Sequence, residues 1–386
     1  MLHDFNGAAD GFYPTSALTL DNAGRLYGTT QVAFQLSHRG SGWLFTPLYT
    51  FQGVPDGLFP NQLTVAANGA LYGTTSEGGL PDCADGDGCG TLFNLRPSGS
   101  VCKAALCPWS ESVLYSFNPF AGSDGYAPVG NVVLDAAGNI YGTTIFGGQY
   151  GQGTVFELTP SDGGWVESII YSFRGLNDGG QPGSGLTMDA AGNLYGTTEV
   201  GGDLSCSSRQ GCGTVYQLAP SASGWTYNIA YAFHNRADGR ETAAGVIIDS
   251  AGNLYGDTYS GGANGGGTVF ELQPANGGWT FKLLYSLTGT SMTGPLGAMG
   301  MDGSGNLYGV TNSQGAYGTG NVFKLTASGG NWTYSDLHDF AGGSNDGAYP
   351  EAGPIVDTNS NVFGTATFGG TGSCFNGCGV VWEITQ

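Results

Sequence analysis

A single phrase, Asp-x-x-Gly-Asn-Leu-Tyr-Gly-Thr-Thr, recurs along this chain and limits what it can fold into. Its Tyr-Gly step falls at seven places, with Phe replacing Tyr in the last: Tyr27, Tyr72, Tyr141, Tyr195, Tyr255, Tyr308 and Phe363. Two further phrases, Gly-Thr-Val-Phe-Glu-Leu and Leu-Tyr-x-Phe, also recur seven times. Self-similarity with a period of this order indicates a repeat architecture whose units pack on one another.

Each repeat has the pattern of four short strands, here called a, b, c and d. In the fourth repeat we expect them at 185–189, 194–198, 213–218 and 225–233. Gly and Asn in the a–b turn supply the positive φ angles that tight turns between antiparallel strands need. Four-stranded units repeated four to eight times are the blades of a β-propeller. The sequence therefore predicts an all-β fold, a seven-bladed β-propeller.

The phase of the repeat at the two ends predicts how the ring closes. The chain starts in a strand d, Leu2 to Phe5, and ends after a strand c, Gly379 to Ile384. The first residues should therefore complete the last blade and remove two free sheet edges. We expect one propeller domain, 1–386, with blades at 14–51, 60–117, 128–173, 182–233, 242–287, 295–340, and 350–386 plus 1–5.

Composition excludes several classes of protein. The 72 glycines, with only 3 lysines and 9 glutamates, disfavour a helical protein, because glycine in a helix costs about 1 kcal/mol relative to alanine. No apolar run approaches the roughly 20 residues that cross a bilayer as a helix. A net charge of −20 should repel phosphate backbones and anionic lipid, so we expect neither nucleic-acid binding nor membrane insertion. Low charge density with an acidic excess suits an exported protein.

The eight cysteines fall into four local pairs: Cys83 and Cys89, Cys102 and Cys107, Cys206 and Cys212, Cys374 and Cys378. An even number in local pairs predicts disulfides that stiffen their loops, and an oxidising compartment. None of the pairs has the CxxC spacing of a zinc knuckle, so the metal alternative is disfavoured. Met1 leads directly into Leu2 and His3 without a basic or apolar leader, so we expect an extracellular or cell-surface protein whose signal peptide has been removed.

The repeat resembles a known family. The phrases at 194–198, 201–202 and 213–218, with the Asp-Gly before the next proline, resemble the GloVer tandem repeat of bacterial extracellular proteins. The resemblance covers nearly the whole chain. It implies secretion or surface display, often beside a sorting anchor, although no sorting segment is visible, and it implies no established activity and no catalytic residues. The a–b turn is also similar to NHL-type and Asp-box turns, which concerns the fold alone.

Two sets of aspartates recur with the repeat. The first precedes strand b and should form Asx turns: Asp21, Asp135, Asp189, Asp249, Asp302 and Asp357. The second lies in Asp-Gly steps of the d–a loops, on one rim of the ring: Asp10, Asp56, Asp124, Asp178, Asp238 and Asp346. We favour turn formation for the second set over Ca²⁺ binding. A denser acidic loop, with Asp82, Asp85 and Asp87, lacks the spacing of an EF-hand. We expect no cofactor, with Ca²⁺ as the open alternative.

Motifs for nucleophilic or phosphate chemistry are absent from the sequence, which contains no Gly-x-Ser-x-Gly, His-Glu-x-x-His or phosphate loop. His3 and His338 occupy the same repeat position, normally Tyr, and we expect a structural role for both. Glycoside hydrolysis needs two carboxylates at a set separation, and the rim offers four glutamates without selecting a pair: Glu77, Glu199, Glu241 and Glu351.

Departures from the repeat mark the predicted ligand site. Asp257 replaces the first Thr of the strand-b motif in blade 5. Four of the ten basic residues fall in neighbouring loops of one face, around blades 4 and 5: Arg174, Arg209, Arg236 and Arg240. With Asp238, Glu241 and Asp257 they form a candidate site for an anionic ligand. The alternative is that the arginines only pair with Asp238, Glu241 and Glu199.

These observations predict a secreted binding or interaction module for glycans. Six rim aromatics could stack on sugar faces: Tyr13, Phe59, Tyr126, Phe146, Tyr150 and Phe368. Two other functions stay open. The first is a polysaccharide-active enzyme, hydrolase or lyase, that uses rim carboxylates or arginines; the second is a structural surface protein. The sequence leaves catalytic residues, ligand identity and oligomeric state undetermined.

Overall fold

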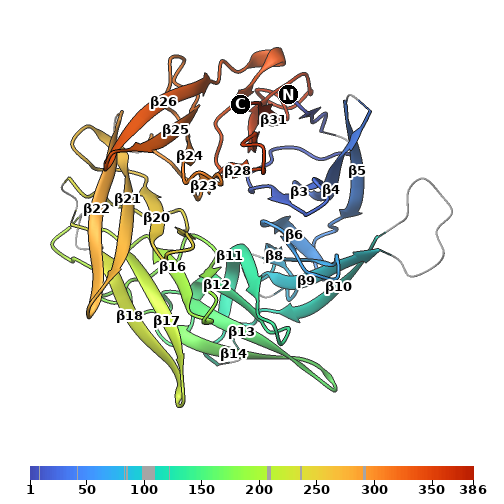
Figure 1. The fold of residues 1–386 in the computed structure, drawn as a ribbon. Coiled ribbons are helices and arrows are strands. Elements are labelled where there is room, and N and C mark those ends of the chain that lie inside the picture. The colour runs from blue at the N-terminus through green and yellow to red at the C-terminus, as the bar shows by residue number, and fades with distance from the viewer. Residues whose placement is uncertain are drawn as a thin grey trace.

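The computed structural model describes residues 1–386 except 8, 41, 82, 84–85, 98–108, 121, 207–209, 235–236 and 290–292. The described residues form seven antiparallel blades arranged in a ring, as the sequence predicts, with a 3₁₀ turn, η3 (Gly343–Asn345), and no α-helix (Figure 1). None of the helices in this described part has the length and hydropathy needed to cross a membrane.

The first three blades run from the inner strand outward. Blade 1 contains β2 (Thr19–Leu20), β3 (Leu26–Thr29), β4 (Val32–Arg39) and β5 (Gly42–Thr50). Blade 2 contains β7 (Thr64–Val65), β8 (Leu71–Gly78), β9 (Thr91–Pro97) and β10 (Trp109–Ser116), with β6 (Gly57–Pro60) also paired to β8. Blade 3 contains β11 (Gly125–Leu134), β12 (Ile140–Gly147), β13 (Thr154–Ser161) and β14 (Gly164–Ser172).

The other four blades repeat this order. Blade 4 contains β15 (Thr187–Met188), β16 (Leu194–Thr198), β17 (Thr214–Ser221) and β18 (Gly224–Ala232). Blade 5 contains β19 (Ile247–Ile248), β20 (Leu254–Thr258), β21 (Gly265–Ala275) and β22 (Gly278–Thr288). Blade 6 contains β23 (Gly300–Met301), β24 (Leu307–Thr311), β25 (Asn321–Ser328) and β26 (Asn331–Asp339). Blade 7 contains β28 (Ile355–Val356), β29 (Val362–Ala366), β31 (Val380–Ile384) and β1 (His3–Asp4), beside the short pair β27 (Gly347–Ala348) and β30 (Phe368–Gly369).

The ring closes as the sequence predicts. β1 pairs antiparallel with β31, with His3 opposite Val381 and Asp4 opposite Val380. Phe5 is fully buried and packs against Phe34 of blade 1, with ring centroids 5.4 Å apart. The two chain termini accordingly lie side by side in blade 7 (Figure 1). Pairing of the first and last strands thus joins the two ends of the ring.

The hydrophobic core lies between neighbouring blades rather than in one centre. In one cluster, Tyr141 and Val155 of blade 3 pack against Leu194 and Tyr216 of blade 4. Within blade 3, the strand-b glycine leaves room for a ring of strand c, because a Cβ built on Gly142 would lie 2.5 Å from the Phe156 ring.

The aspartate before strand b caps its turn, as predicted. Asp189 Oδ1 accepts the backbone amides of Ala191 and Asn193, and Oδ2 accepts the Asn193 amide and the Tyr195 hydroxyl. Burial alone would raise the pKa of Asp189, but these hydrogen bonds outweigh burial and lower it. The ionised carboxylate therefore holds the a–b turn together.

Candidate functional site

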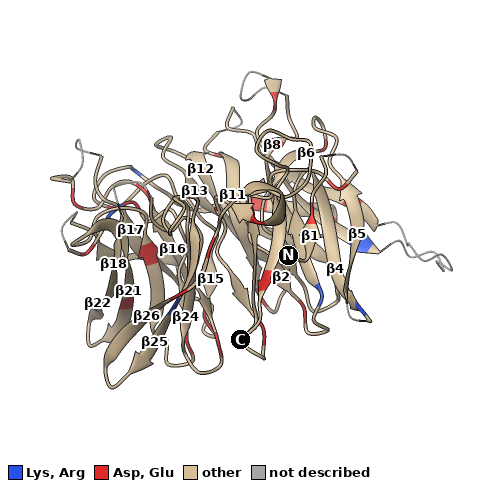
Figure 2. Cartoon of the chain, turned by 90° about the horizontal axis from the view of Figure 1, so that it is seen from above, with Lys and Arg blue, Asp and Glu red and all other residues tan. Residues whose placement is uncertain are grey.

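The d–a loops and the segments after strand b share one face of the ring. The amide of Glu199, just after β16, donates to the carbonyl of Gln181 in the d–a loop, and Tyr259 donates in the same way to Glu241. The a–b turns and c–d hairpins lie on the opposite face. Asp and Glu occur along both rims, whereas Lys and Arg are few (Figure 2). We call the face with the d–a loops the loop face.

The aspartates of the Asp-Gly steps hold their own loops. Asp56 Oδ2 accepts the Tyr49 hydroxyl and the Gln52 amide, both at 2.9 Å. Asp124, Asp178 and Asp238 accept equivalent bonds. His3 and His338 supply the same contact to Asp10 and Asp346, which accounts for histidine at a tyrosine position. These hydrogen bonds hold the d–a turns together, which is the role that the sequence favours for the aspartates of the Asp-Gly steps.

A channel of about 390 Å³ runs along the axis, and residues before and within the innermost strands line it. They include Ser16, Asn61, Asn131 and Ser184, and no charged side chain is among the lining residues described. The channel wall thus offers hydroxyl, amide and backbone groups. One of its two entrances lies on the loop face.

Six residues beside this entrance adopt a left-handed backbone although none is glycine. They have φ between 51° and 60°: Tyr13, Phe59, Ala127, Gln181, Glu241 and Tyr349. Such a conformation costs roughly 1–2 kcal/mol for a residue with a Cβ and persists only where neighbouring structure enforces it. Each directly precedes the residue that begins the approach to strand a, on the loop face. We call these six residues the rim ring.

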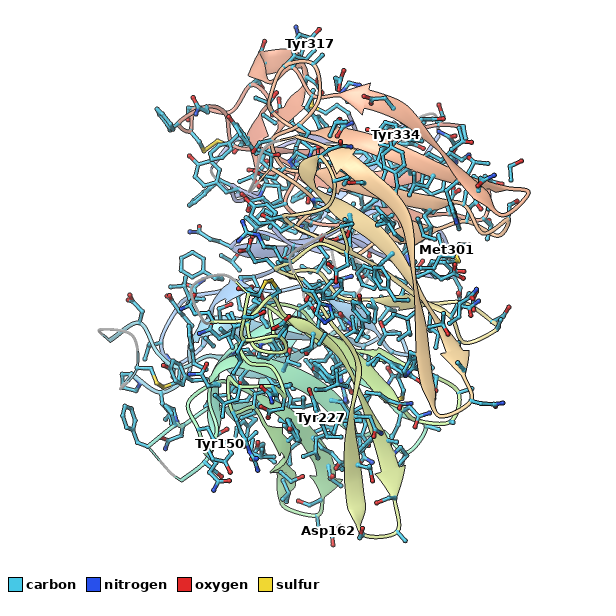
Figure 3. The ribbon with its side chains drawn as sticks, turned by 90° about the vertical axis from the view of Figure 1, so that its left-hand side faces the viewer. Tyr150, Asp162, Tyr227, Met301, Tyr317 and Tyr334 are labelled. Carbon is cyan, nitrogen blue, oxygen red and sulfur yellow. A yellow bond between two sulfur atoms is a disulfide. The ribbon has the colours of Figure 1, made fainter. Side chains whose placement is uncertain are left out.

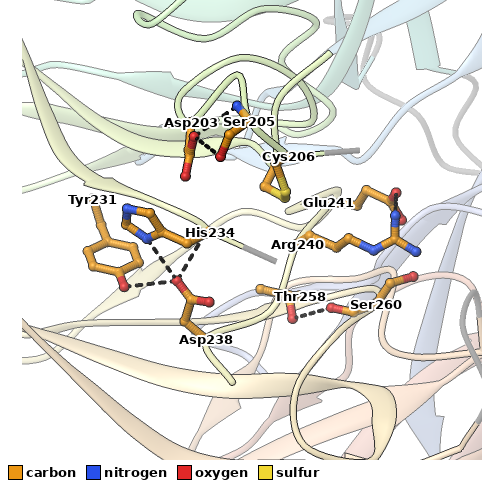
Figure 4. The surroundings of a disulfide bond; sticks show 11 residues. Asp203, Ser205, Cys206, Tyr231, His234, Asp238, Arg240, Glu241, Thr258 and Ser260 are labelled. Atoms are coloured by element: carbon orange, nitrogen blue, oxygen red, sulfur yellow. Dashed lines mark hydrogen bonds and ion pairs between the residues drawn. A yellow bond between two sulfur atoms is a disulfide. The ribbon is translucent and has the colours of Figure 1, made fainter. Parts of the chain in front are cut away.

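Hydrogen bonds from the backbone amide to the preceding blade hold five of the six residues, three of them through a disulfide loop. The amides of Tyr13, Ala127 and Glu241 donate to the carbonyls of Cys378, Cys89 and Cys212 in the preceding blade. Those cysteines are bonded to Cys374, Cys83 and Cys206, as predicted (Figure 4 shows one of these loops). Each disulfide therefore stiffens the loop that positions a rim residue. The fourth predicted pair, Cys102 and Cys107, lies outside the described residues.

Three glutamates gather at one side of the entrance. Glu199 follows β16, Glu241 belongs to the rim ring, and Glu351 precedes β28. Burial raises the pKa of Glu199, and the charge of Glu241 adds to this effect. Burial also raises the pKa of Tyr259, and the charges of Glu241 and Glu351 raise it further. All three carboxyls therefore lie near enough to act on one another or on Tyr259, and we call them with Tyr259 the acidic mouth.

The fourth glutamate considered from the sequence lies elsewhere. Glu77 is in β8 of blade 2, opposite Leu58, and after burial the charge that raises its pKa is that of Asp87. Tyr259 and the left-handed Tyr349 were not singled out from the sequence. Tyr349 could have been suspected from its place before a proline, as in Tyr13 and Phe59, but Tyr259 carries no sequence signal.

Aromatic side chains occupy other parts of the rim. The Phe368 ring contacts both Tyr13, at 5.2 Å between centroids, and Tyr349, at 5.8 Å. On blade 3, Phe146 stacks on Tyr126 at 5.3 Å. Phe59 is 55% exposed. Flat apolar surfaces thus stand beside the polar entrance.

The structure places the two described arginines of the predicted site in different surroundings. Arg174 lies 5.3 Å from the Tyr150 ring centroid, beside the outer strand β14 (Tyr150 is labelled in Figure 3). Arg240 forms an ion pair with Glu241, Nη1 to Oε1 3.1 Å, next to the acidic mouth (Figure 4). Asp238 accepts the Tyr231 hydroxyl and the His234 amide. Arg209 and Arg236 lie outside the described residues.

Asp257 lies beneath the rim rather than on it. Its exposed fraction is 2%, and both side-chain oxygens lack a hydrogen-bond partner. Threonine at the equivalent position of blade 4, Thr197, donates to the carbonyl of Ala244 in the next blade. Burial raises the pKa of Asp257 well above its usual range. Burial therefore favours the neutral form of this carboxyl.

Within the described residues, no group of three or more His, Cys, Asp or Glu side chains could hold a metal ion. Asp82 and Asp85 of the acidic loop lie outside that part of the chain.

Comparisons with known proteins identify a repeat family. A family model described as the Gloeobacter/Verrucomicrobia repeat matches residues 1–208 and again 204–386. No curated protein matches.

Among solved structures, a putative oxidoreductase (glucose dehydrogenase) from Thermus thermophilus is 14% identical, with a TM-score of 0.46 over 86% of this chain and 99% of that one. YjhT is 13% identical, with a TM-score of 0.45 over 86% and 95% of the two chains. A putative gluconolactonase is 14% identical, with a TM-score of 0.43 over 87% and 94%. Similarity at this level says nothing about activity.

Proposed function

The chain belongs to the Gloeobacter/Verrucomicrobia repeat family, whose description names no activity, and we propose from its site that the protein binds a glycan at the entrance of the central channel. The observation that carries this proposal is the rim ring. Six non-glycine residues are held in a costly backbone conformation at the same point of six blades. Strain of this kind clusters at ligand-binding sites, because it fixes side chains before the ligand arrives.

The chemistry of the entrance suits a ligand rich in hydroxyl groups. Glu199, Glu241 and Glu351 offer carboxylate acceptors, and the channel wall offers amides and hydroxyls. Tyr13, Tyr349 and Phe368 offer ring faces beside them. Sugars present hydroxyl groups on their edges and C–H groups on their faces, so they match both kinds of surface.

The charge at the entrance favours a neutral sugar or an amino sugar. Arg240 already pairs with Glu241, and two further glutamates stand beside that pair. An anionic ligand would meet this surplus of carboxylates, which raises the energetic cost of its binding. The anionic ligand considered from the four arginines is therefore the less favoured choice.

The proposed binding takes place outside the cell. Three disulfides among the described residues indicate an oxidising environment. The sugars available outside the cell are the glycans of cell walls and extracellular matrices.

A second candidate function, glycoside cleavage, is favoured by one observation. Glu199 has a raised pKa and lies near Glu241. Two neighbouring carboxyls in different environments are the pair that glycosidases use as acid and base or nucleophile.

The experiment is a glycan array with the wild-type protein, followed by calorimetry and mass analysis of each hit. Glu241→Gln should weaken binding by tenfold or more, since hydrogen bonds to a charged group contribute about 1.5–3 kcal/mol. Tyr349→Ala should also weaken binding, because it removes a ring face that stacks on the sugar. Asp162→Asn, an exposed change at the c–d hairpin tip of blade 3, is the control (Figure 3). Binding without product supports a binding module, and a cleaved product supports the enzyme. If the array yields no hit, or if both variants bind like the wild type, the entrance is not the site.

A further inference from the structure

A second pocket lies against the outer strand of blade 3 and shares no lining residue with the central channel. Its volume is about 390 Å³, and small-molecule sites occupy roughly 300–1,000 Å³. Strand β14 forms one wall, the b–c loop with Gln149 and Tyr150 forms another, and Arg174 of the d–a loop borders both. None of the lining residues described is Asp or Glu, although the protein carries a net charge of −20. We call this cavity the blade 3 pocket.

The Arg174 side chain is held in place without its charge being neutralised. Its guanidinium carbon lies 5.3 Å from the centroid of the Tyr150 ring, and this stacking leaves the N–H edge of the guanidinium open to a partner. The carboxylate of Asp178, in the same loop, accepts the Tyr171 hydroxyl at 2.8 Å and the backbone amide of Arg174 at 3.2 Å. Among the residues that the structure describes, no carboxylate forms an ion pair with the Arg174 guanidinium, whereas three other basic side chains each have one: Arg25, Arg240 and Lys282.

This pair of residues belongs to blade 3 and not to the repeat. The residue that follows the Leu-Tyr-x-Phe phrase is arginine only in blade 3, and the other six blades carry Asn6, Gln52, Asn118, His234, Thr288 and Ala341. The b–c loop of blade 5 has the same length as that of blade 3, and it carries Asn264 where blade 3 has Tyr150. Arg174 and Tyr150 are therefore not needed to build a blade, yet the fold brings them together across the outer strand.

The rest of the pocket supplies polar groups. Ser123, Gln149 and Ser172 line it together with Arg174 and Tyr150. Ser172 Oγ accepts the backbone amide of Gln149 at 3.4 Å, so the proton of this hydroxyl can be donated to a ligand. The pocket thus combines one positive charge with hydroxyl and amide groups and an aromatic ring.

We propose that the blade 3 pocket binds a sugar acid, a uronic-acid residue of an extracellular glycan, through its carboxylate. The Arg174 guanidinium pairs with the carboxylate through two parallel N–H donors, and the serine and glutamine side chains bind the ring hydroxyls. One arginine matches a single negative charge. A phosphate group, with a charge of about −1.5 to −2 at neutral pH, would be matched only in part.

This site is independent of the channel entrance. It contains no residue of the rim ring or of the acidic mouth, so its binding can be measured whether or not the entrance holds a sugar. The two sites also differ in charge, because the entrance carries a surplus of carboxylates and the blade 3 pocket carries an unpaired guanidinium.

The test is calorimetry of the intact protein with trigalacturonate and with its methyl ester, which keeps the sugar rings but removes the charges. Trigalacturonate should bind saturably, and the ester at least tenfold more weakly. Arg174→Gln should weaken binding of trigalacturonate at least tenfold, and Arg174→Lys should retain only part of the affinity because lysine lacks the planar fork of donors. The matched control is Arg39→Gln, which removes another exposed positive charge, at the c–d hairpin of blade 1, and should leave the affinity unchanged.

Three results would overturn the proposal. Equal weakening by Arg174→Gln and Arg39→Gln would mean that only the net charge of the protein matters. Equal affinity for trigalacturonate and its methyl ester would mean that the carboxylate is not recognised. If trigalacturonate fails to bind at millimolar concentration, the pocket does not take a sugar acid; binding of a short peptide with a free C-terminal carboxylate, lost in Arg174→Gln, would then assign the pocket to a peptide terminus.

Discussion

Glu111 of β10 faces Asp56 of the preceding d–a loop, and one carboxyl oxygen of each is buried without a hydrogen-bond partner. The other Asp56 oxygen accepts the Tyr49 hydroxyl. One blade further on, Glu167, Asp124 and Tyr115 repeat this arrangement. Both glutamates occupy the position that carries a stacked aromatic ring in blades 1, 4, 5 and 6. At these two blade interfaces, a pair of carboxyl groups thus lies where the other blades have a stacked aromatic ring.

These carboxyl pairs should make stability depend on pH. Burial, and then the charge of Asp56, raises the pKa of Glu111 to about 7; burial, and then Asp124, does the same for Glu167. A carboxyl with a raised folded-state pKa stabilises the fold fully below its unfolded value near 4.5, and this contribution is lost as pH rises through 7. Because water still reaches part of each side chain, we expect a loss of about 1–2 kcal/mol per glutamate.

The measurement is the free energy of unfolding between pH 5 and pH 8. Glu111→Gln with Glu167→Gln should flatten this dependence, and Asp162→Asn should leave it unchanged. Glu111→Phe should stabilise the protein at pH 8, because it restores a ring beside Tyr49. A double variant that keeps the full pH dependence of the wild type would show that these pairs do not cause it.

Asp257→Thr should stabilise the protein. The substitution replaces a buried carboxyl without a partner by a hydroxyl that can donate to the next blade, as Thr197 does. A buried unsatisfied polar group costs about 1–3 kcal/mol, so the free energy of unfolding should rise by about that amount at neutral pH. Thr197→Asp, the opposite substitution at the equivalent position of blade 4, is the control and should lower the free energy of unfolding. A loss of stability in Asp257→Thr would mean that the carboxyl has a role that this packing does not show.

Removal of residues 1–5 should destabilise the whole ring. It removes the fully buried Phe5 and the pairing of β1 with β31. Loss of a buried Phe side chain alone costs about 3–5 kcal/mol, so thermal unfolding should shift down strongly. Removal of Met1 alone, which is 54% exposed, is the control. Equal melting temperatures of the truncated and intact proteins would refute closure by β1.

All four cysteine pairs should be oxidised within their own loops. Denatured, unreduced protein should therefore contain no free thiol, and peptide mapping should link Cys102 to Cys107 as well as the three described pairs. Reduction of the disulfides should change the free energy of glycan binding by more than it lowers the free energy of unfolding. The reason is that the disulfide loops position Tyr13 and Glu241 of the rim ring. A link between Cys83 and Cys206 would contradict the local pairing.

Features that repeat in every blade could be predicted from the sequence. The a–b aspartates, the strand-b glycines and the phase of the first and last strands act within a blade or between neighbouring blades, so their spacing alone identified the seven-bladed ring and its closure. The functional details could not be predicted in this way. Glu199, Glu241 and Glu351 meet although as many as 152 residues separate them, and the left-handed backbone at Tyr349 depends on a hydrogen bond from its amide to the carbonyl of Thr319 in another blade. Local periodicity determines which strands form; the tertiary structure alone decides which side chains meet across blade interfaces, because those contacts depend on packing between segments far apart in the chain.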